Sequence, residues 1–305
     1  MSRRSPPRIE WSPDSTRFLA RLGDDRIRLH AADGSLLRSM GTALDVRWAG
    51  ELVISLDDRS TLRWHGPHGV VDQRRTNTGS YAAPVACFAR DVERIAFTTD
   101  RGDVGVVTFD ASVWALDRKR HVLPPELTVV LSPDGARLAI GFESDAPVGR
   151  GFVMFDLATD TVLERGFIEL PTRLDAPMSF AFDRVGARCA PCHPEQVAGL
   201  GVLHVGHGKV GQQPRHHPGG VTAVALEPLG MIAAYAYADA QPGTAGRLQF
   251  DFLSPDPPVG SSVEVHSTLV LDVALPDIVA LGFDPTSRWL ACLASTGEIE
   301  IIVVP

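Results

Sequence analysis

The 305-residue chain has few cysteines, almost no lysine and no long apolar run. Four cysteines are too few for a disulfide scaffold. Because no run of 18 apolar residues occurs and the start, MSRRSPPRIE, lacks the apolar stretch of a signal peptide, we expect a soluble, unexported, cytoplasmic protein without a membrane segment. Lys119 and Lys209 are the only lysines among 29 basic residues, and the dominance of arginine beside abundant Ala, Gly and Pro indicates a high-GC bacterial genome.

An excess of positive charge is also missing. The formal net charge is −8, which argues against nucleic-acid binding because neutralising phosphates requires a basic surface. The charge is uneven: residues 1–120 carry 19 basic and 16 acidic side chains, a net of +3, and residues 121–305 carry 10 and 21, a net of −11. We therefore expect a basic side and an acidic side.

Short catalytic motifs are absent as well. The chain contains no Gly-rich phosphate loop, no nucleophile elbow and no His-Glu-x-x-His motif. The acidic pairs Asp24-Asp25 and Asp57-Asp58 lie where turns are expected, so turn chemistry explains them better than calcium binding does. Nothing in the sequence selects a catalytic residue, and we expect a protein that is not an enzyme and has no cofactor.

What the chain does contain is a repeat. Seven segments share an apolar anchor that closes a short β-like run and is followed by a turn and a second apolar run. The anchors, spaced by 37 to 57 residues, are Trp11, Trp48, Phe88, Leu131, Phe182, Leu226 and Phe283. In four of them an arginine stands six residues after the anchor: Arg17, Arg94, Arg137 and Arg188.

Each segment continues with a third alternating run, and most have a fourth. Period-2 alternation with Gly, Asp and Pro at the turns indicates strands and hairpins, and no stretch has a sustained helical period. Four short antiparallel strands in each unit of roughly 40 to 45 residues specify a β-propeller blade. The predicted fold is all-β: a single seven-bladed propeller over residues 1–305 with four-stranded antiparallel blades. The predicted blades are residues 8–42, 43–77, 83–120, 127–169, 178–217, 221–270 and 278–305.

The chain resembles the WD40-repeat family of β-propellers over nearly its full length. Ser12-Pro13-Asp14-Ser15 and Ser132-Pro133-Asp134-Gly135 are similar to the family's turn between the first two strands of a blade. Phe109-Asp110 and Phe155-Asp156 stand where the family has its Trp-Asp dipeptide, which this chain lacks. The resemblance implies a degenerate WD40-like propeller and a role in protein–protein interaction, and it transfers no family-specific binding residue.

The last blade is predicted to have three strands, because the chain ends on its third. Pro6 and Pro7 cannot donate backbone hydrogen bonds, so the segment before the first blade is a poor fourth strand. An open edge around Ile299, Ile301 and Val303 is therefore predicted to accept a strand from a partner protein.

The segment RCAPCH contains Cys189-Ala-Pro-Cys192-His193, which allows several interpretations. Cys-x-x-Cys-His is the local signature of covalent haem, and Cys-x-x-Cys can be a redox pair or half of a zinc site. With His204 and His207 the two cysteines approach zinc-finger spacing. Laid against the fourth blade, however, both cysteines fall on one strand, where they could share no metal, disulfide or haem unless the strand broke. The other interpretation is that the cysteines are buried core thiols and the histidines are loop residues.

A basic cluster is expected on the outermost strands of the first three blades. It comprises Arg38, Arg74, Arg75, Arg118, Lys119 and Arg120. There are two interpretations of this cluster. It is either an ordinary solvent-exposed surface at the rim of the propeller or a docking face for an acidic partner, including the acidic half of another copy.

Together these observations predict a non-catalytic scaffold or adaptor within a bacterial multi-protein assembly. It would bind proteins through its loop faces and the open edge of the last blade. The alternative is a propeller that binds zinc or a small molecule, or an enzyme with its site in the central channel.

Overall fold

The computed structural model describes most of the chain. The described residues are 6–59, 61–75, 86–89, 94–98, 104–108, 113–115, 127–145, 148–169, 179–192, 203–204, 221–237, 245–255 and 265–305. The chain divides into two compact units. The first comprises residues 1–5, 23–27 and 40–175, and the second comprises residues 6–22, 28–39 and 176–305.

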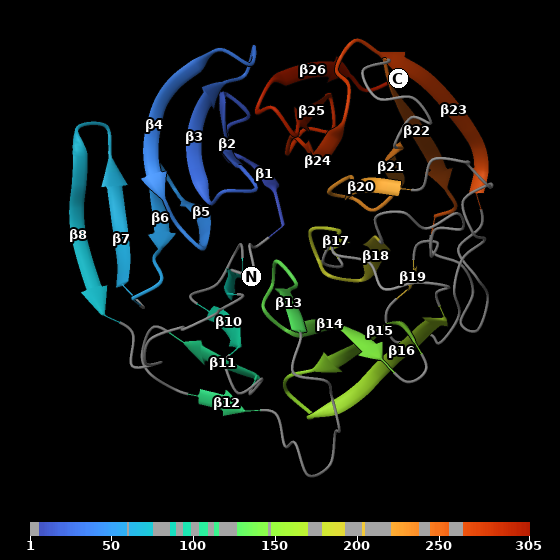
Figure 1. The fold of residues 1–305 in the computed structure, drawn as a ribbon, viewed down its shortest axis with the longest axis horizontal. Coiled ribbons are helices and arrows are strands. Elements are labelled where there is room, and N and C mark those ends of the chain that lie inside the picture. Colours follow the sequence, from blue (N-terminus) through green and yellow to red (C-terminus); the bar gives the residue numbers. More distant parts are fainter. Residues whose placement is uncertain are drawn as a thin grey trace. The chain divides into compact units, whose positions relative to one another are not determined.

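Throughout the described part of the chain the regular elements are strands, and they form seven antiparallel sheets in which strands adjacent in sequence pair with one another (Figure 1). The all-β, antiparallel prediction is thus confirmed. This follows from the sequence, because two-residue alternation places one set of side chains on each face of a strand and short polar turns favour pairing with the next strand.

The first unit carries three of these sheets, each with four strands. The sheet β5-β6-β7-β8 contains β5 (Asp45–Ala49), β6 (Leu52–Leu56), β7 (Thr61–Gly66) and β8 (Gly69–Arg75). The next contains β9 (Ala86–Phe88), β10 (Arg94–Thr98), β11 (Val104–Thr108) and β12 (Val113–Ala115). The third contains β13 (Leu127–Leu131), β14 (Arg137–Asp145), β15 (Val148–Asp156) and β16 (Thr161–Glu169).

The second unit contains three whole sheets and most of a fourth, whose remaining residues are assigned to the first unit. That fourth sheet contains β1 (Arg8–Trp11), β2 (Arg17–Arg21), β3 (Arg26–Ala31) and β4 (Leu36–Thr42). The others are β17 (Ser179–Phe182), β18 (Arg188–Cys192) and β19 (Leu203–His204); β20 (Val221–Leu226), β21 (Ile232–Tyr237), β22 (Gly246–Leu253) and β23 (Val265–Val273); and β24 (Ile278–Phe283), β25 (Trp289–Ala294) and β26 (Ile299–Val303).

The number of full blades differs from the sequence prediction. In six sheets the third strand has five residues or more, and these six sheets are the blades of the structure, which therefore has six blades rather than the predicted seven. In the remaining sheet the described part of the third strand, β19, has two residues and no fourth strand is described. This is the predicted blade of residues 178–217, in which Pro191 and Pro194 and a run of Gly and His residues weaken the strand pattern.

The anchor-and-turn repeat is confirmed. Every anchor except Trp48 is the last residue of its strand, and Trp48 is the last but one. The four arginines six residues further on each begin the next strand. Six of the seven anchors are buried and Phe182 is half-buried, so the repeat recognised in the sequence marks the first hairpin of each sheet.

Hydrogen bonds within the turn explain the Ser-Pro-Asp motif. The Ser12 hydroxyl accepts a hydrogen bond from the Arg17 amide at 3.0 Å and donates one to Asp14. In the equivalent turn Ser132 accepts from the Arg137 amide at 2.9 Å and donates to Asp134 at 2.6 Å. The serine therefore satisfies the backbone of a short hairpin that would otherwise be left with an open amide.

The Ser12 hydroxyl should control the acidity of Asp14. Its hydrogen bond, assisted by Thr16, lowers the pKa of Asp14 from an ordinary 3.8 to about 2. A lowered folded-state pKa means that the stabilisation is present above pH 3.8 and is lost as the pH falls through about 2. We expect Ser12→Ala to raise the pKa of Asp14 towards 3.8, measured by carboxyl NMR titration. Ser35→Ala, which removes the partner of Asp33, should leave Asp14 unchanged; an unaltered Asp14 titration in Ser12→Ala would contradict this account.

Each unit has apolar cores between neighbouring sheets. In the first unit, one cluster joins β6 and β7 to β10 through Ile54, Leu62 and Ile95, and another joins the β9–β12 sheet to the β13–β16 sheet. In the second unit, Trp11 and Phe18 pack with Leu293, and further clusters lie between β21 and its two neighbouring sheets. Within each unit, neighbouring sheets thus bury apolar side chains against one another, which a single four-stranded sheet could not do alone.

Two of the repeat arginines also tie neighbouring sheets together. In the first unit, Arg94 Nη1 donates to the carbonyl of Gly135 at 2.7 Å. In the second unit, the buried Arg188 donates to the carbonyl of Gly230 and to that of Ser254, the latter at 2.8 Å. The acceptor glycines occupy the first turn of the following sheet. Gly230 has φ of 72°, and a Cβ there would lie 2.9 Å from Arg188 Cδ, so this arginine contact requires glycine.

Candidate functional site

The turn between β6 and β7 is organised by one buried carboxylate. Asp57 Oδ1 accepts hydrogen bonds from the amides of Arg59 at 3.0 Å and Thr61 at 2.8 Å. Its Oδ2 forms an ion pair with Arg63 Nη2 at 2.7 Å. The interpretation of this acidic pair as turn chemistry is confirmed for Asp57. The same carboxylate also positions an arginine on β7.

The hairpin of β7 and β8 gathers polar side chains on one face. Thr61 pairs with Arg75 and Arg63 pairs with Gln73. Residues directly opposite each other, and those two positions further along, share a face of a sheet. Thr61, Arg63, Gln73 and Arg75 therefore lie on one face of the hairpin.

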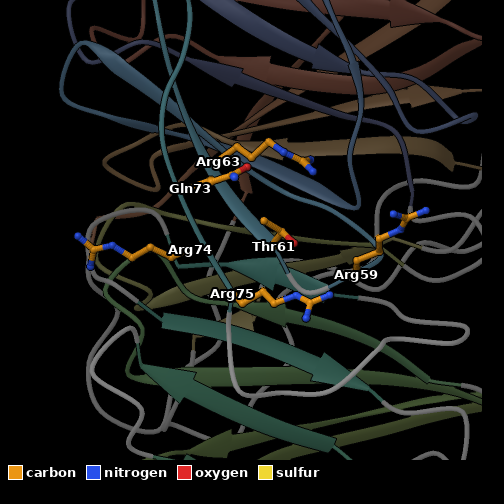
Figure 2. A pocket seen from close by; sticks show the side chains of 6 residues that line it. All are labelled: Arg59, Thr61, Arg63, Gln73, Arg74 and Arg75. Atoms are coloured by element: carbon orange, nitrogen blue, oxygen red, sulfur yellow. The ribbon is translucent and has the colours of Figure 1, made fainter.

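These residues line a pocket in the first unit. It has a volume of about 320 Å³ and is lined by Arg59, Thr61, Arg63, Gln73, Arg74 and Arg75, with no acidic residue among them. Figure 2 shows the guanidinium groups of Arg59, Arg63 and Arg75 directed to the same side, and that of Arg74 directed to the opposite side. We call the face that bears Arg59, Thr61, Arg63, Gln73 and Arg75 the arginine face.

Arg74 has different surroundings. Its Cζ lies 5.3 Å from the centroid of the Trp64 ring, and its Nε lies 3.6 Å from Asp72 Oδ2. Within the described part of the chain, Arg59 and Arg75 form no such ion pair with a carboxylate. Two of the three guanidinium groups on the arginine face are therefore without a described counter-ion.

Strand β8 is the outermost strand of its sheet and is open to solvent. Six of its seven residues are exposed, including Val70 at 52% and Val71 at 62%. Charged side chains on an exposed outer strand protect it from edge-to-edge association. An outer strand that carries both apolar side chains and arginines also presents the groups from which protein interfaces are built.

Only three residues of the predicted basic cluster lie in the part of the chain that the structure describes. Arg74 and Arg75 lie on β8 in the first unit, and Arg38 lies on β4 in the second, where it is half-buried. Arg118, Lys119 and Arg120 lie outside the described residues. Sequence reasoning selected Arg74 and Arg75 but missed Arg59 and Arg63, whose signal is the register of the hairpin that brings them beside Arg75.

The predicted open edge lies on β26. Its sheet has the order β24-β25-β26, and no described strand pairs with the outer side of β26. Ile299 and Ile301 pack against the cluster that contains Trp11, and Val303 is 64% exposed. The side chains of the two isoleucines are thus used within the second unit. The pairing of a partner strand with β26 remains a prediction.

The predicted zinc residues are described only in part. Cys189 is fully buried, Cys192 and His204 lie on β18 and β19 without described side chains, and His207 lies outside the described residues. The pairing of β18 with β17 runs without interruption from Cys189 to Cys192, so the strand does not break between the cysteines. The zinc, haem and redox hypotheses stay untested predictions, with no geometry here to favour them.

The described residues contain neither a metal-binding cluster nor a membrane-spanning helix. No group of three or more His, Cys, Asp or Glu side chains in this part of the chain could hold a metal ion. No helix long and apolar enough to cross a membrane occurs among these residues.

Burial raises the pKa of the Cys292 thiol, with Glu300 adding to the effect, so this cysteine is a core residue rather than a nucleophile.

Comparison with known proteins identifies the fold. No protein-family model and no curated protein matches the chain. Among solved structures, the chain is similar to the β-propeller domain of Cps50 (Swd1) from Myceliophteria thermophila, with a TM-score of 0.64 and 11% sequence identity over 99% of this chain and 98% of that one.

The protein is therefore an antiparallel β-propeller. The WD40 interpretation is supported at the level of the propeller, and its specific repeat remains a resemblance because no family model matches. Phe155-Asp156 lies at the end of β15, a third strand, as the resemblance implies, and Phe109-Asp110 lies outside the described residues. Since one fold carries many functions, the function has to be argued from the surface.

Proposed function

We propose that this propeller is a non-catalytic interaction scaffold that binds an acidic protein partner through the arginine face and the outer strand β8. The observation that carries the proposal is the pocket whose described lining contains the three guanidinium groups of the arginine face and no acidic residue.

Charge and exposure support this role. The chain as a whole has a formal net charge of −8, and the arginine-bearing hairpin lies in its basic part, residues 1–120, where 19 basic and 16 acidic side chains give a net charge of +3. Electrostatic complementarity sets the orientation and the encounter rate of two proteins. Arginine is also enriched at protein interfaces, because its planar guanidinium binds carboxylates with two hydrogen bonds.

Reversing the charge of β8 should abolish the interaction. We expect Arg74→Glu together with Arg75→Glu to reduce recovery of the partner from a native-host lysate at least about tenfold, because each acidic contact becomes repulsive. The measurement is quantitative mass spectrometry of proteins recovered at low and high salt with the wild-type and variant proteins. Far-UV circular dichroism would verify that the variant is folded.

A matched control is available on the second unit. Arg184 and Arg288 are both exposed, and their replacement by glutamate changes the net charge by the same amount. This control should retain the partner. Equal loss from both double variants would make the binding a general charge effect and reject the proposal, as would full recovery with the β8 variant. Sedimentation velocity would identify a second copy of the chain as the acidic partner.

A further inference from the structure

We propose that the arginine face is a binding site for a doubly charged phosphoryl group on a phosphorylated side chain of the partner protein. This inference rests on the proposed function and names the chemistry that the same surface recognises. It is argued from the charge, geometry and size of the pocket.

The charge of the face matches a dianion. The guanidinium groups of Arg59, Arg63 and Arg75 contribute three positive charges. Asp57 pairs with Arg63 and offsets one of them. The remaining two positive charges match a phosphoryl group, which carries a charge of about −1.5 to −2 near neutral pH. A single carboxylate would leave part of this charge uncompensated.

The geometry presents several donors to one ligand. Arg63 is held by its 2.7 Å ion pair with Asp57, which also accepts the amides of the turn that carries Arg59. The guanidinium of Arg63 and the backbone of Arg59 are thus positioned before a ligand arrives, which lowers the entropic cost of binding. Gln73 and Thr61 add an amide and a hydroxyl to the same face. Guanidinium groups donate paired hydrogen bonds that fit phosphate oxygens.

The size and openness of the pocket favour a side chain over a free cofactor. Its volume of about 320 Å³ lies at the lower end of the range of roughly 300–1,000 Å³ that is typical of small-molecule sites. It lies on an exposed outer hairpin, where Val70 and Val71 leave apolar surface for the neighbouring residues of a peptide. A phosphorylated segment could therefore place its phosphoryl group in the pocket and lie along β8.

Peptide arrays test this inference. The probes are peptides of random flanking sequence whose central residue is phosphoserine, phosphotyrosine, glutamate or serine. We expect the phosphorylated peptides to bind at least about tenfold more tightly than the glutamate peptides, and Arg75→Ala or Arg59→Ala to weaken that binding about tenfold. Arg74→Ala is the matched control, because its guanidinium lies on the opposite face over Trp64, and it should change binding less than about twofold.

Four results would overturn the inference. These are equal binding of glutamate peptides, equal effects of Arg74→Ala and Arg75→Ala, inorganic phosphate binding as tightly as the peptides, and a single-stranded oligonucleotide binding with the same dependence on Arg75. Phosphatase treatment of the lysate separates this inference from the proposed function. A partner that is lost from the β8 charge-reversal variant but survives phosphatase treatment would keep the scaffold role and reject the phosphoryl site.

Discussion

Trp11→Ala should lower the free energy of unfolding by about 4 kcal/mol, the largest loss expected for a single side chain here. Trp11 is 2% exposed, its ring centroid lies 4.9 Å from that of Phe18, and it packs with Leu293 in the cluster that joins the sheets of β1 and β24. Its indole N–H donates to the carbonyl of Gly282 at 2.8 Å. The substitution removes the buried ring and leaves that carbonyl without its donor. Urea unfolding followed by far-UV circular dichroism measures the loss.

Two variants separate the causes of this effect. Trp11→Phe keeps most of the apolar volume and removes the indole hydrogen bond, so its cost should be about 1–2 kcal/mol. Trp289→Ala removes a tryptophan that is 39% exposed at the start of β25 and should cost under about 1 kcal/mol. If Trp11→Ala cost no more than Trp289→Ala, Trp11 would not lie in an inter-sheet core.

Arg188→Ala should destabilise the protein by about 3 kcal/mol. Arg188 is 3% exposed and donates to two carbonyls from separate segments, those of Gly230 and Ser254. A hydrogen bond from a charged donor contributes about 1.5–3 kcal/mol, and loss of the buried side chain leaves both carbonyls unsatisfied. Relief from the desolvation of a buried cation offsets part of the cost. The urea midpoint and slope together give the change.

The exposed Arg184, four residues earlier in the same hairpin, is the control for Arg188. Arg184→Ala should change the stability by less than about 0.5 kcal/mol. Arg188→Lys should be almost as destabilising as Arg188→Ala, because one ammonium group cannot reproduce the planar guanidinium that reaches two carbonyls. A stability of Arg188→Ala equal to that of Arg184→Ala would show that Arg188 does not tie the two sheets together.

Much of the fold could be predicted from the sequence because its signals are local. The apolar anchors, the Ser-Pro-Asp turns and the following arginines recur at a spacing that a four-stranded sheet requires, and they coincide with strand ends in the structure. The fold class rests on two-residue alternation, which any extended strand with one buried face must have. The number of blades was predicted one too high at residues 178–217, because an anchor and a turn predict the first hairpin of a blade but say little about its outer strands.

The candidate site could be predicted only in part. Arg74 and Arg75 were visible as adjacent charges on an outer strand, but the sequence could not assign each to a face. The pairing of β7 with β8 shifts by one residue between Trp64 and His65, a bulge close to the turn. Without that shift Arg74 rather than Arg75 would pair with Thr61, since a one-residue slip moves every side chain of a strand to the other face.

The sequence by itself therefore determined that this protein is built of short antiparallel hairpins with apolar anchors, because alternation and turn chemistry act between residues close along the chain. The tertiary structure alone decided which of two adjacent arginines joins Arg59 and Arg63, and that Arg188 ties its sheet to the next. Both depend on the register and separation of segments brought together by folding. No local pattern encodes those quantities, because a bulge or a buried hydrogen bond is selected by the packing around it.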